Sequence, residues 1–350
     1  MQNRLVPVLI PLSIALAAGV HLTSCGPKAV VVDTAQLTMF RPLPEAVESQ
    51  KNPITEAKVN LGRMLYYDAR LSRNQDVSCN SCHDLANYGV DGQPVSDGFK
   101  GRKGTRNAPT VYNAAGHFVQ FWDGRAPDVE EQAKGPVMNP AEMAMSSPKA
   151  VVAVLRSIPG YVAAFKKAFP ATKNPVTFDN AARAIGAFER RLMTPSRWDK
   201  FLKGDRTALT SAEKAGFNKY METGCQACHA GTYLGGEIYQ KLGAVKPYPD
   251  TSDAGRQAVT KQESDRLVFK VPSLRNIDKT APYFHTGKVA PLEEAVKEMA
   301  QYQLGKQLKA DEIASMVTFL KTLTGEIPAE YIKRPVLPKS TARTPKPNNT

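Results

Sequence analysis

Four of the five cysteines in this 350-residue chain form two pairs, and each pair is followed by a histidine. The two strings are Cys79-Asn80-Ser81-Cys82-His83 and Cys225-Gln226-Ala227-Cys228-His229. The pattern C-x-x-C-H is the attachment sequence for c-type haem. Two thiols at this spacing reach the two vinyl groups of one porphyrin, and the histidine then lies under the iron as its proximal ligand. The sequence therefore predicts two covalently bound c-type haems, with His83 and His229 as iron ligands.

Zinc binding and thiol redox chemistry are the alternatives for paired cysteines. Zinc needs four ligands that converge at finger or ribbon spacing, whereas these two pairs lie in opposite halves of the chain. A redox-active dithiol needs a βαβ context, which the sequence lacks. Five cysteines are also too few for a disulfide-dense scaffold. Haem attachment is the preferred interpretation.

The elements that position these motifs are predicted to be helices. Thr210 and Glu213 form a capping box before a helix that runs to Glu222, and Gly224 ends it directly before Cys225. Apolar residues three and four positions apart predict further helices at Thr177–Met193, Leu292–Leu304 and Asp311–Leu323, with Gly325 as a stop after the last. No alternating run is long enough to predict a sheet. With 42% hydrophobic residues, we expect a folded, mainly α protein rather than a disordered chain.

A repeat relates the two halves of the chain. Shifting residues 109–136 by 163 positions places them on 272–299 without a gap, and seven of the 28 pairs are identical. Ordinary composition would give about two identities by chance. The identical pairs are Pro109/Pro272, Asn113/Asn276, Phe121/Phe284, Gly124/Gly287, Glu130/Glu293, Glu131/Glu294 and Lys134/Lys297. We therefore predict two haem-bearing halves related by internal duplication.

The last position of this alignment distinguishes the two predicted haems. Met299 lies on the predicted helix from Leu292, where its thioether can bind haem iron, whereas its counterpart Pro136 has no side-chain donor. The alternative for Met299 is a core methionine, because it shares a helix face with Leu292. We favour His229 and Met299 as the ligands of the second haem, and an open iron above His83. An open haem binds small oxidants, whereas a six-coordinate haem passes electrons.

The ends of the chain predict export and anchoring. Arg4 and the apolar run after it indicate a lipoprotein signal peptide at residues 1–24, for which an ordinary signal peptide is the alternative. Leu22-Thr23-Ser24-Cys25-Gly26 is similar to a bacterial lipobox, with Cys25 as the lipidated residue. We expect a periplasmic protein on the outer membrane, because Gly26 is not the aspartate of inner-membrane retention. The expected organisation is a linker at 25–50, domains at 51–200 and 201–330, and a disordered basic tail at 331–350.

Several strings between residues 51 and 330 resemble those of bacterial di-haem cytochrome c peroxidases and their MauG relatives. Besides both C-x-x-C-H motifs, they are Asp68-Ala69-Arg70-Leu71-Ser72, Arg106-Asn107-Ala108-Pro109-Thr110, Phe121-Trp122-Asp123-Gly124-Arg125-Ala126, Glu131-Gln132-Ala133, Gly135-Pro136, Asn139-Pro140-x-Glu142-Met143 and Ala281-Pro282-Tyr283-Phe284-His285. The resemblance implies two mainly α, cytochrome c-like domains. It also implies reduction of hydrogen peroxide to water, with electrons from a small cytochrome c or a blue-copper protein.

The resemblance further implies roles for individual residues. Glu142 matches the distal carboxylate that moves a proton between the peroxide oxygens, and Gln132 matches the distal amide that hydrogen-bonds the oxidant. Trp122 matches the indole between the haems. Without the family, these would be a surface glutamate, a helix-surface glutamine and a core tryptophan. The family also implies a calcium ion, which Asn107, Thr280 and Pro282 would surround. His285 matches a histidine near the second haem, but we do not assign it as an iron ligand because Met299 fits the repeat better.

One position departs from the family pattern. Many members carry a histidine in the loop after the first motif, and this ligand blocks the first haem until the second is reduced. The family spacing places Phe99 there, and Gly98-Phe99-Lys100 contains no iron ligand. We therefore predict that the first haem is open in the fully oxidised protein, so that activity needs no reductive activation.

Two other functions compete with the peroxidase. A MauG-like enzyme oxidises residues of a partner protein, but it uses a tyrosine where the repeat places Met299. A non-enzymatic di-haem electron carrier is disfavoured by Glu142 and Gln132. The net charge of +13 comes without a basic helix or recognition motif for nucleic acid, and a basic body would instead steer an acidic electron donor. Members of the family are commonly dimers, so a homodimer is left as an open expectation.

Overall fold

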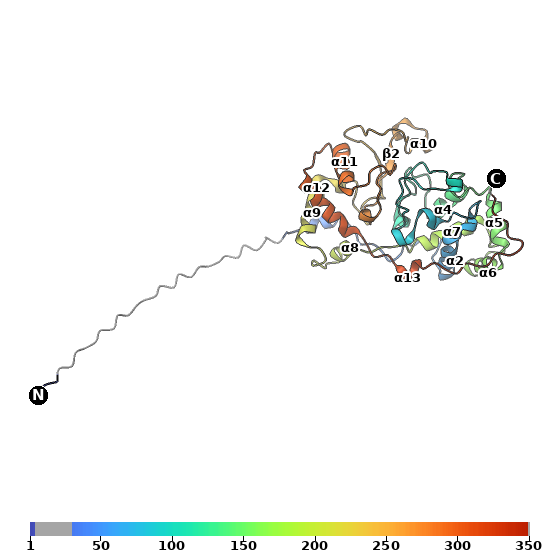
Figure 1. Ribbon diagram of the computed structural model, residues 1–350, viewed down its shortest axis with the longest axis horizontal. Coiled ribbons are helices and arrows are strands. Elements are labelled where there is room, and N and C mark those ends of the chain that lie inside the picture. The colour runs from blue at the N-terminus through green and yellow to red at the C-terminus, as the bar shows by residue number, and fades with distance from the viewer. Residues whose placement is uncertain (4–29, 349–350) are drawn as a thin grey trace.

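The computed structural model describes residues 1–3 and 30–348 (Figure 1). Most of the predicted signal peptide, including the lipobox with Cys25, lies outside the described residues. Within the described ranges, no helix is both long and apolar enough to cross a membrane. The helices gather in two groups, which we call the first lobe (residues 51–195) and the second lobe (residues 196–325) (Figure 1).

The described residues are mainly helical, as predicted. The first lobe contains α2 (Glu56–Tyr67), α3 (Cys79–Cys82), α4 (Val129–Met138), α5 (Pro148–Arg156), α6 (Pro159–Ala168) and α7 (Phe178–Glu189). The second lobe contains α8 (Arg197–Leu202), α9 (Ser211–Thr223), β1 (Tyr239–Lys241), α10 (Gln257–Thr260), β2 (Val268–Lys270), α11 (Leu292–Leu304) and α12 (Ala310–Leu320). Two short helices, α1 (Thr34–Leu37) and α13 (Ala329–Ile332), flank the lobes in sequence. The strands β1 and β2 pair antiparallel, with Tyr239 opposite Lys270.

The helices predicted around the motifs are confirmed. The capping box of Thr210 and Glu213 begins α9, and Gly224, with φ of 99°, ends it. The helix α11 has the predicted bounds. The predicted helix at 311–323 is α12 followed by a 3-10 turn at Lys321–Leu323, and the one at 177–193 is the shorter α7.

Each lobe is built on a crossing of two helices at a glycine. The first crossing joins α2 and α7 at Gly62, where an added Cβ would lie 1.9 Å from the carbonyl oxygen of Ala184. The second joins α9 and α12 at Gly216, where an added Cβ would lie 2.1 Å from the carbonyl oxygen of Ser315. Only a residue without a side chain allows two backbones to approach this closely.

Each crossing lies in a separate hydrophobic core. Buried residues of the first core include Leu61, Leu65, Tyr161, Phe165, Ile185 and Phe188. Those of the second include Trp198, Phe201, Phe217, Met316 and Phe319. Because Trp198 belongs to the second core, the second lobe begins a few residues before the predicted boundary at 201.

The two segments of the predicted repeat have the same backbone features at the same offset. Positive φ is uncommon for residues other than glycine, yet Asn113 and Asn276 have φ of 63° and 62°, and Phe121 and Phe284 have φ of 66° and 64°. The isolated bridges Gln120–Ala126 and Tyr283–Val289 are also related by this shift, as are the first residues of α4 and α11, Val129 and Leu292.

The two repeat asparagines meet at one threonine between the lobes. The amide nitrogens of Asn113 and Asn276 both donate to Oγ1 of Thr194, each at 2.9 Å. Their amide oxygens accept from the backbone N–H groups of Thr194 and Gly325, at 3.0 and 2.9 Å. All three polar side chains are buried. A buried polar group without a hydrogen-bond partner would destabilise the fold, and these bonds supply the partners.

The prediction of a linker at 25–50 is wrong for its described residues. Val32, Leu37 and Phe40 are buried in the second core, although they precede the first lobe in sequence. The ring of Phe40 packs edge-on against Trp198 at 5.5 Å. A few isolated apolar residues produce no periodicity in the sequence, but each can fill a gap in a distant core.

The prediction of a disordered tail is wrong for residues 333–348. The helix α13 already packs on the first lobe, where Ile332 is buried in the first core, and the chain after it continues along that lobe (Figure 1). The guanidinium of Arg70 donates to the carbonyl oxygen of Pro338 at 2.9 Å, and the hydroxyl of Thr341 donates to the carbonyl oxygen of Ser157 at 2.9 Å. Thr344 is buried. The prolines of this segment favour an extended backbone, which docks through polar groups rather than through a periodic apolar face.

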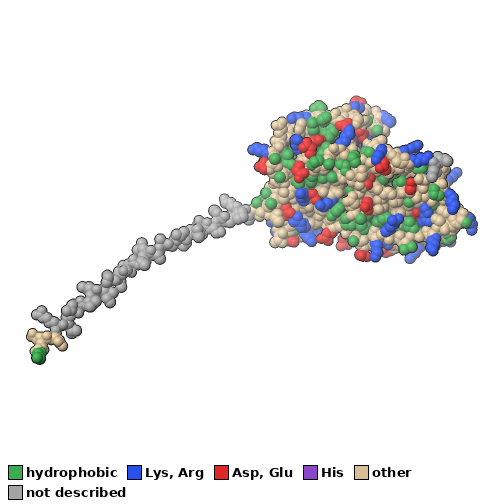
Figure 2. Space-filling view, viewed as in Figure 1, with side chains coloured by type: hydrophobic (Ala, Val, Ile, Leu, Met, Phe, Trp, Pro, Cys, Tyr) green, Lys and Arg blue, Asp and Glu red, His purple; other side chains and the backbone are tan. Residues whose placement is uncertain are grey.

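Basic and acidic side chains are interspersed over the face of the molecule shown in Figure 2. The net positive charge of the chain is therefore not gathered into one broad patch on that face.

Candidate active site

Both C-x-x-C-H motifs line the same cavity. Its volume is 790 Å³, and its walls come from both lobes. The motif residues in its lining are Cys79, Cys82, His83, Cys225, Cys228 and His229. The structure thus brings together two motifs that are far apart in the sequence.

The first motif is held by the end of α2. Ser78 and Ser81 cap α3 reciprocally, and His83 follows the helix. The hydroxyl of Tyr66 on α2 donates to the carbonyl oxygen of His83 at 2.8 Å. Burial lowers the pKa of His83, which favours the neutral imidazole that binds iron.

The second motif has the same type of support. The left-handed conformation of Gly224 turns the chain out of α9 into the 3-10 turn Cys225–Ala227. The hydroxyl of Tyr220 donates to the carbonyl oxygen of His229. The Nδ1 atom of His229 lies 3.1 Å from the carbonyl oxygen of Leu234, and this contact leaves Nε2 free to bind iron.

The motif cysteines are poorly suited to thiolate chemistry. Burial raises the pKa of Cys79 to about 12 and that of Cys225 to about 11. A neutral, buried thiol is a weak nucleophile and a poor zinc ligand. In the described part of the chain, no three His, Cys, Asp or Glu side chains form a metal-binding group. Two thiols and a neutral imidazole on the wall of a large apolar cavity fit a covalently attached porphyrin.

The predicted sixth-ligand position also lines the cavity. Met299 on α11 contributes to the cavity wall, as does its repeat counterpart Pro136 on α4. Leu292 and Ala295 of α11 line the cavity as well, so the face of the helix that carries Met299 is turned to the cavity.

The proposed distal residues Glu142 and Gln132 line the same cavity as His83. Gln132 is on α4, which Asp128 caps by accepting from the N–H of Glu131 at 2.9 Å. The Nδ2 of Asn139 donates to Oε1 of Glu142 at 2.7 Å. Burial raises the pKa of Glu142, while Arg125 and this hydrogen bond oppose the shift. A carboxyl group with a raised pKa is suited to proton transfer near neutral pH.

Phe99 lies behind Glu142 and is not among the residues that line the cavity. Its N–H donates to the carbonyl oxygen of Glu142 at 2.7 Å, and its side chain is 3% exposed. Three cations surround its ring, with Arg73 and Lys100 at 5.6 Å and Arg102 at 5.8 Å from the centroid. The loop at position 99 is thus packed against the protein beside Glu142.

Trp122 lies where the two lobes meet. Its indole Nε1 donates to the carbonyl oxygen of Asn107 at 2.9 Å, and its own carbonyl oxygen accepts from the N–H of Lys270 at 2.8 Å. Its ring is 6.3 Å from that of His285, which is buried and stacked on Phe269 at 4.3 Å. The structure therefore places Trp122 between elements of the first and second lobes.

The three residues predicted to surround calcium line one cavity. Asn107 lies beside His285, because its N–H donates to the carbonyl oxygen of that residue at 2.8 Å. The Nδ2 of Asn107 donates to the carbonyl oxygen of Gln93 at 3.0 Å. Thr280 and Pro282 also belong to the cavity wall.

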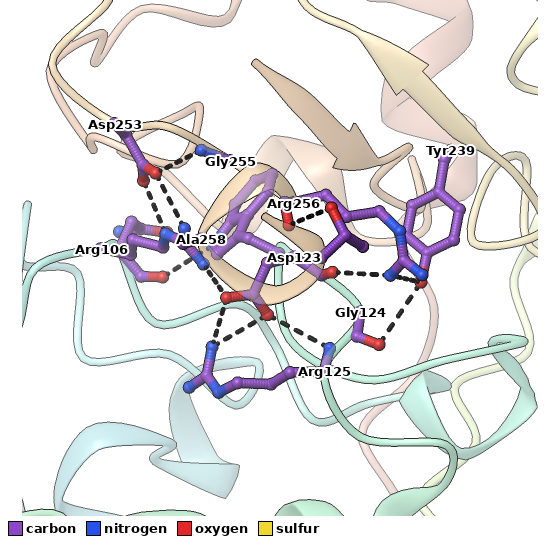
Figure 3. A network of polar contacts seen from close by, with 12 residues as sticks. Arg106, Asp123, Gly124, Arg125, Tyr239, Asp253, Gly255, Arg256 and Ala258 are labelled. Atoms are coloured by element: carbon purple, nitrogen blue, oxygen red, sulfur yellow. Dashed lines mark hydrogen bonds and ion pairs between the residues drawn. The ribbon is translucent and has the colours of Figure 1, made fainter. Parts of the chain in front are cut away.

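A network of ion pairs next to Trp122 was not predicted from the sequence (Figure 3). Arg106 donates to Asp123 at 2.6 Å and, through two nitrogens, to Asp253 of the second lobe at 2.6 and 2.8 Å. Arg125 donates to both oxygens of Asp123, at 3.0 and 2.9 Å. Arg256 donates to the carbonyl oxygen of Asp123 at 3.1 Å. Arg106 and Asp253 are 147 positions apart, and no local pattern marks such a pair.

Several known proteins are similar to this chain. A family model described as di-haem cytochrome c peroxidase matches residues 56–207. The chain is 49% identical over 316 residues to the cytochrome c551 peroxidase of Pseudomonas aeruginosa, and the match covers 88% of this chain and 90% of that protein. It is 48% identical over 288 residues to the cytochrome c551 peroxidase of Nitrosomonas europaea, covering 82% and 85%. The solved structure of a MauG-like protein associated with microbial copper homeostasis aligns with a TM-score of 0.73 and 31% identity, covering 84% of this chain and 97% of that one.

Proposed function

The chain belongs to the di-haem cytochrome c peroxidase family, and we propose that it reduces hydrogen peroxide to water at a haem bound by His83. The balanced reaction takes one peroxide, two protons and two electrons to two waters. The haems supply the redox chemistry when they are bound, and the protein supplies ligands, protons and orientation. The observation that carries the proposal is that Glu142, Gln132 and His83 line one cavity, although they come from three separate segments.

Glu142 is the proton-transfer group in this proposal. It accepts the proton that leaves one peroxide oxygen and returns it to the other oxygen as the O–O bond breaks, so the carboxylate is regenerated. The hydrogen bond from Asn139 holds Oε1 and orients the carboxylate. Gln132 donates an amide hydrogen to the oxidant. The buried surroundings that raise the pKa of Glu142 favour this transfer.

His229 and Met299 are proposed as the ligands of the electron-transfer haem. The repeat supports this assignment, because Met299 and Pro136 occupy equivalent positions on helices that begin at equivalent residues. The matched φ angles support an internal duplication into two cytochrome c-like domains. A small cytochrome c or copper protein would deliver electrons at this second haem, and Trp122 lies between the lobes on the way to the first.

The first haem is proposed to be open in the oxidised protein. The buried position of Phe99, away from the cavity lining, supports this proposal, because the residue at the position of the blocking histidine has no iron-binding atom. Turnover would then begin without prior reduction.

Calcium binding and membrane anchoring complete the proposal. Because the Nδ2 of Asn107 donates to Gln93, its amide oxygen is the atom that a calcium ion would meet, together with oxygens of Thr280 and Pro282. Cys25 would carry the lipid that tethers the protein to the outer membrane on its periplasmic side.

The decisive experiment is peroxide-dependent oxidation of reduced cytochrome c by the mature, oxidised protein, paired with EPR of the same sample. We expect immediate turnover and one high-spin haem beside one low-spin haem. Two low-spin haems and a lag that pre-reduction removes would contradict the open first haem. Absence of turnover with any small donor, together with peroxide-dependent oxidation of a partner protein, would favour the MauG-like alternative.

A further inference from the structure

Lys270 is a buried lysine on the wall of the haem cavity. It ends β2, lies at the lobe junction beside Trp122, and is 7% exposed. Its ammonium group contacts Nδ1 of His117 at 3.3 Å and the carbonyl oxygen of Val119 at 3.2 Å. These partners account for two of its three hydrogens, and neither carries a negative charge.

No carboxylate among the described residues forms an ion pair with Lys270. The charge of Asp123 raises the pKa of Lys270, but the carboxylate of Asp123 is already bound by Arg106 and Arg125. Burial lowers the pKa of Lys270 to about 8, and Asp123 only partly opposes this shift. A lone ammonium group removed from water is costly unless an anion accompanies it.

His117 adds a second donor without a partner. Because its Nδ1 accepts from Lys270, its ring proton is on Nε2. That Nε2 atom is buried and has no hydrogen-bond partner in the described residues. His117 also lines the cavity, and its ring is held by Tyr233, edge-on at 5.5 Å, and by Gly236, where an added Cβ would come within 2.4 Å of the ring.

We propose that Lys270 and His117 form a binding site for a carboxylate, and that this carboxylate is a haem propionate. The inference rests on the proposed presence of two haems in the cavity. The propionates are the anionic groups of a c-type haem, whereas its vinyl edge is taken up by the cysteines. The segment Gly235–Gly236 separates His117 from His229, because a Cβ at Gly235 would lie 3.2 Å from Nδ1 of His229. The site therefore also places the positive charge of Lys270 next to the haems, where it influences their reduction potentials.

The test compares Lys270→Met, Lys270→Arg and His117→Leu in the mature di-haem protein, with Lys241→Met as the control. Lys241 is an exposed lysine on β1, the strand that pairs with β2. Haem content is measured first, and then the potential of each haem is followed by spectroelectrochemical titration. Removing a cation near a porphyrin disfavours the reduced form. At a fixed solution potential, we expect the reduced-to-oxidised ratio of one haem to fall by about tenfold in Lys270→Met and by less in His117→Leu. Lys270→Arg should stay near wild type.

The outcomes are distinguishable from failure of the proposed function. A wild-type protein without two haems would refute that function directly. A fall in the potential of the low-spin haem alone would assign the carboxylate to the second haem, and a fall in the high-spin haem alone would assign it to the first; both support the site. Two haems in every variant, with potentials in Lys270→Met and His117→Leu equal to those of Lys241→Met, would overturn it. If Lys270→Met fails to incorporate haem, His117→Leu decides the question.

Discussion

Replacing Glu142 by glutamine tests the proton-transfer step most directly. Glutamine keeps the length and shape of the side chain, and its amide oxygen can still accept from Nδ2 of Asn139, which lies 2.7 Å from Oε1 in the native structure. The backbone contact with Phe99 does not involve the side chain and should persist. The substitution therefore removes the titrating group while leaving its local support in place.

The expected effect of Glu142→Gln is large. General acid–base catalysis by one group contributes about 10²–10⁴-fold, which corresponds to about 3–5.5 kcal/mol of barrier at about 1.4 kcal/mol per tenfold. The loss should fall on kcat, because peroxide is small and Gln132 still binds it. Thermal stability should change by less than about 1 kcal/mol, since no buried ion pair is broken.

The assay is steady-state oxidation of reduced cytochrome c, with haem content and EPR measured on each preparation. Glu131→Gln is the matched control, because Glu131 is half-exposed and its partner is Lys134 at 2.7 Å. Such a surface pair contributes little, so activity should remain near wild type. A kcat for Glu142→Gln within threefold of wild type, with both haems intact, would refute the role of Glu142 as the proton carrier.

Three further perturbations probe the fold and the second haem. Met299→Leu should make the His229 haem high-spin and lower its potential, as seen by EPR and redox titration. Gly62→Ala should destabilise the protein by about 1–3 kcal/mol in thermal unfolding, because its Cβ would lie 1.9 Å from the carbonyl oxygen of Ala184. Burial raises the pKa of Glu189 from 4.5 to about 8, so the folded state holds a proton that the unfolded state releases. The free energy of unfolding should therefore fall as pH rises from about 5 to 8. In Glu189→Gln this fall should be smaller by a few kcal/mol.

Each of these expectations has a clear contrary result. An unchanged low-spin signal in Met299→Leu would mean that another residue binds the second iron. Gly104→Ala is the control for Gly62→Ala, because its Cβ would meet its nearest neighbour at 3.7 Å, an ordinary contact; equal melting of the two variants would contradict the crossing argument. A pH profile of Glu189→Gln that matches wild type would show that Glu189 does not titrate between pH 5 and 8.

The helices around the motifs were predictable because their signals are local. The capping box of Thr210 and Glu213 and the stop at Gly224 act within one or two turns, and α9 has those limits. The repeat was visible for a related reason, since Asn113 and Asn276 are one of seven identical pairs that share a single offset of 163 positions. The linker and the tail were mispredicted because Phe40 and Thr344 are buried by residues far away in sequence.

The sequence by itself determined the chemistry that each motif can perform. The spacing of two thiols and an adjacent histidine predict haem attachment within five consecutive residues, so this prediction does not depend on the rest of the chain. Only the tertiary structure decided which groups face one another. Asp253 meets Arg106 across the lobe junction, and Lys270 is buried against His117 without a carboxylate partner among the described residues. Which charged groups meet depends on how the two cores pack together. The spacing of residues along the chain does not specify the distance between such groups in the folded protein.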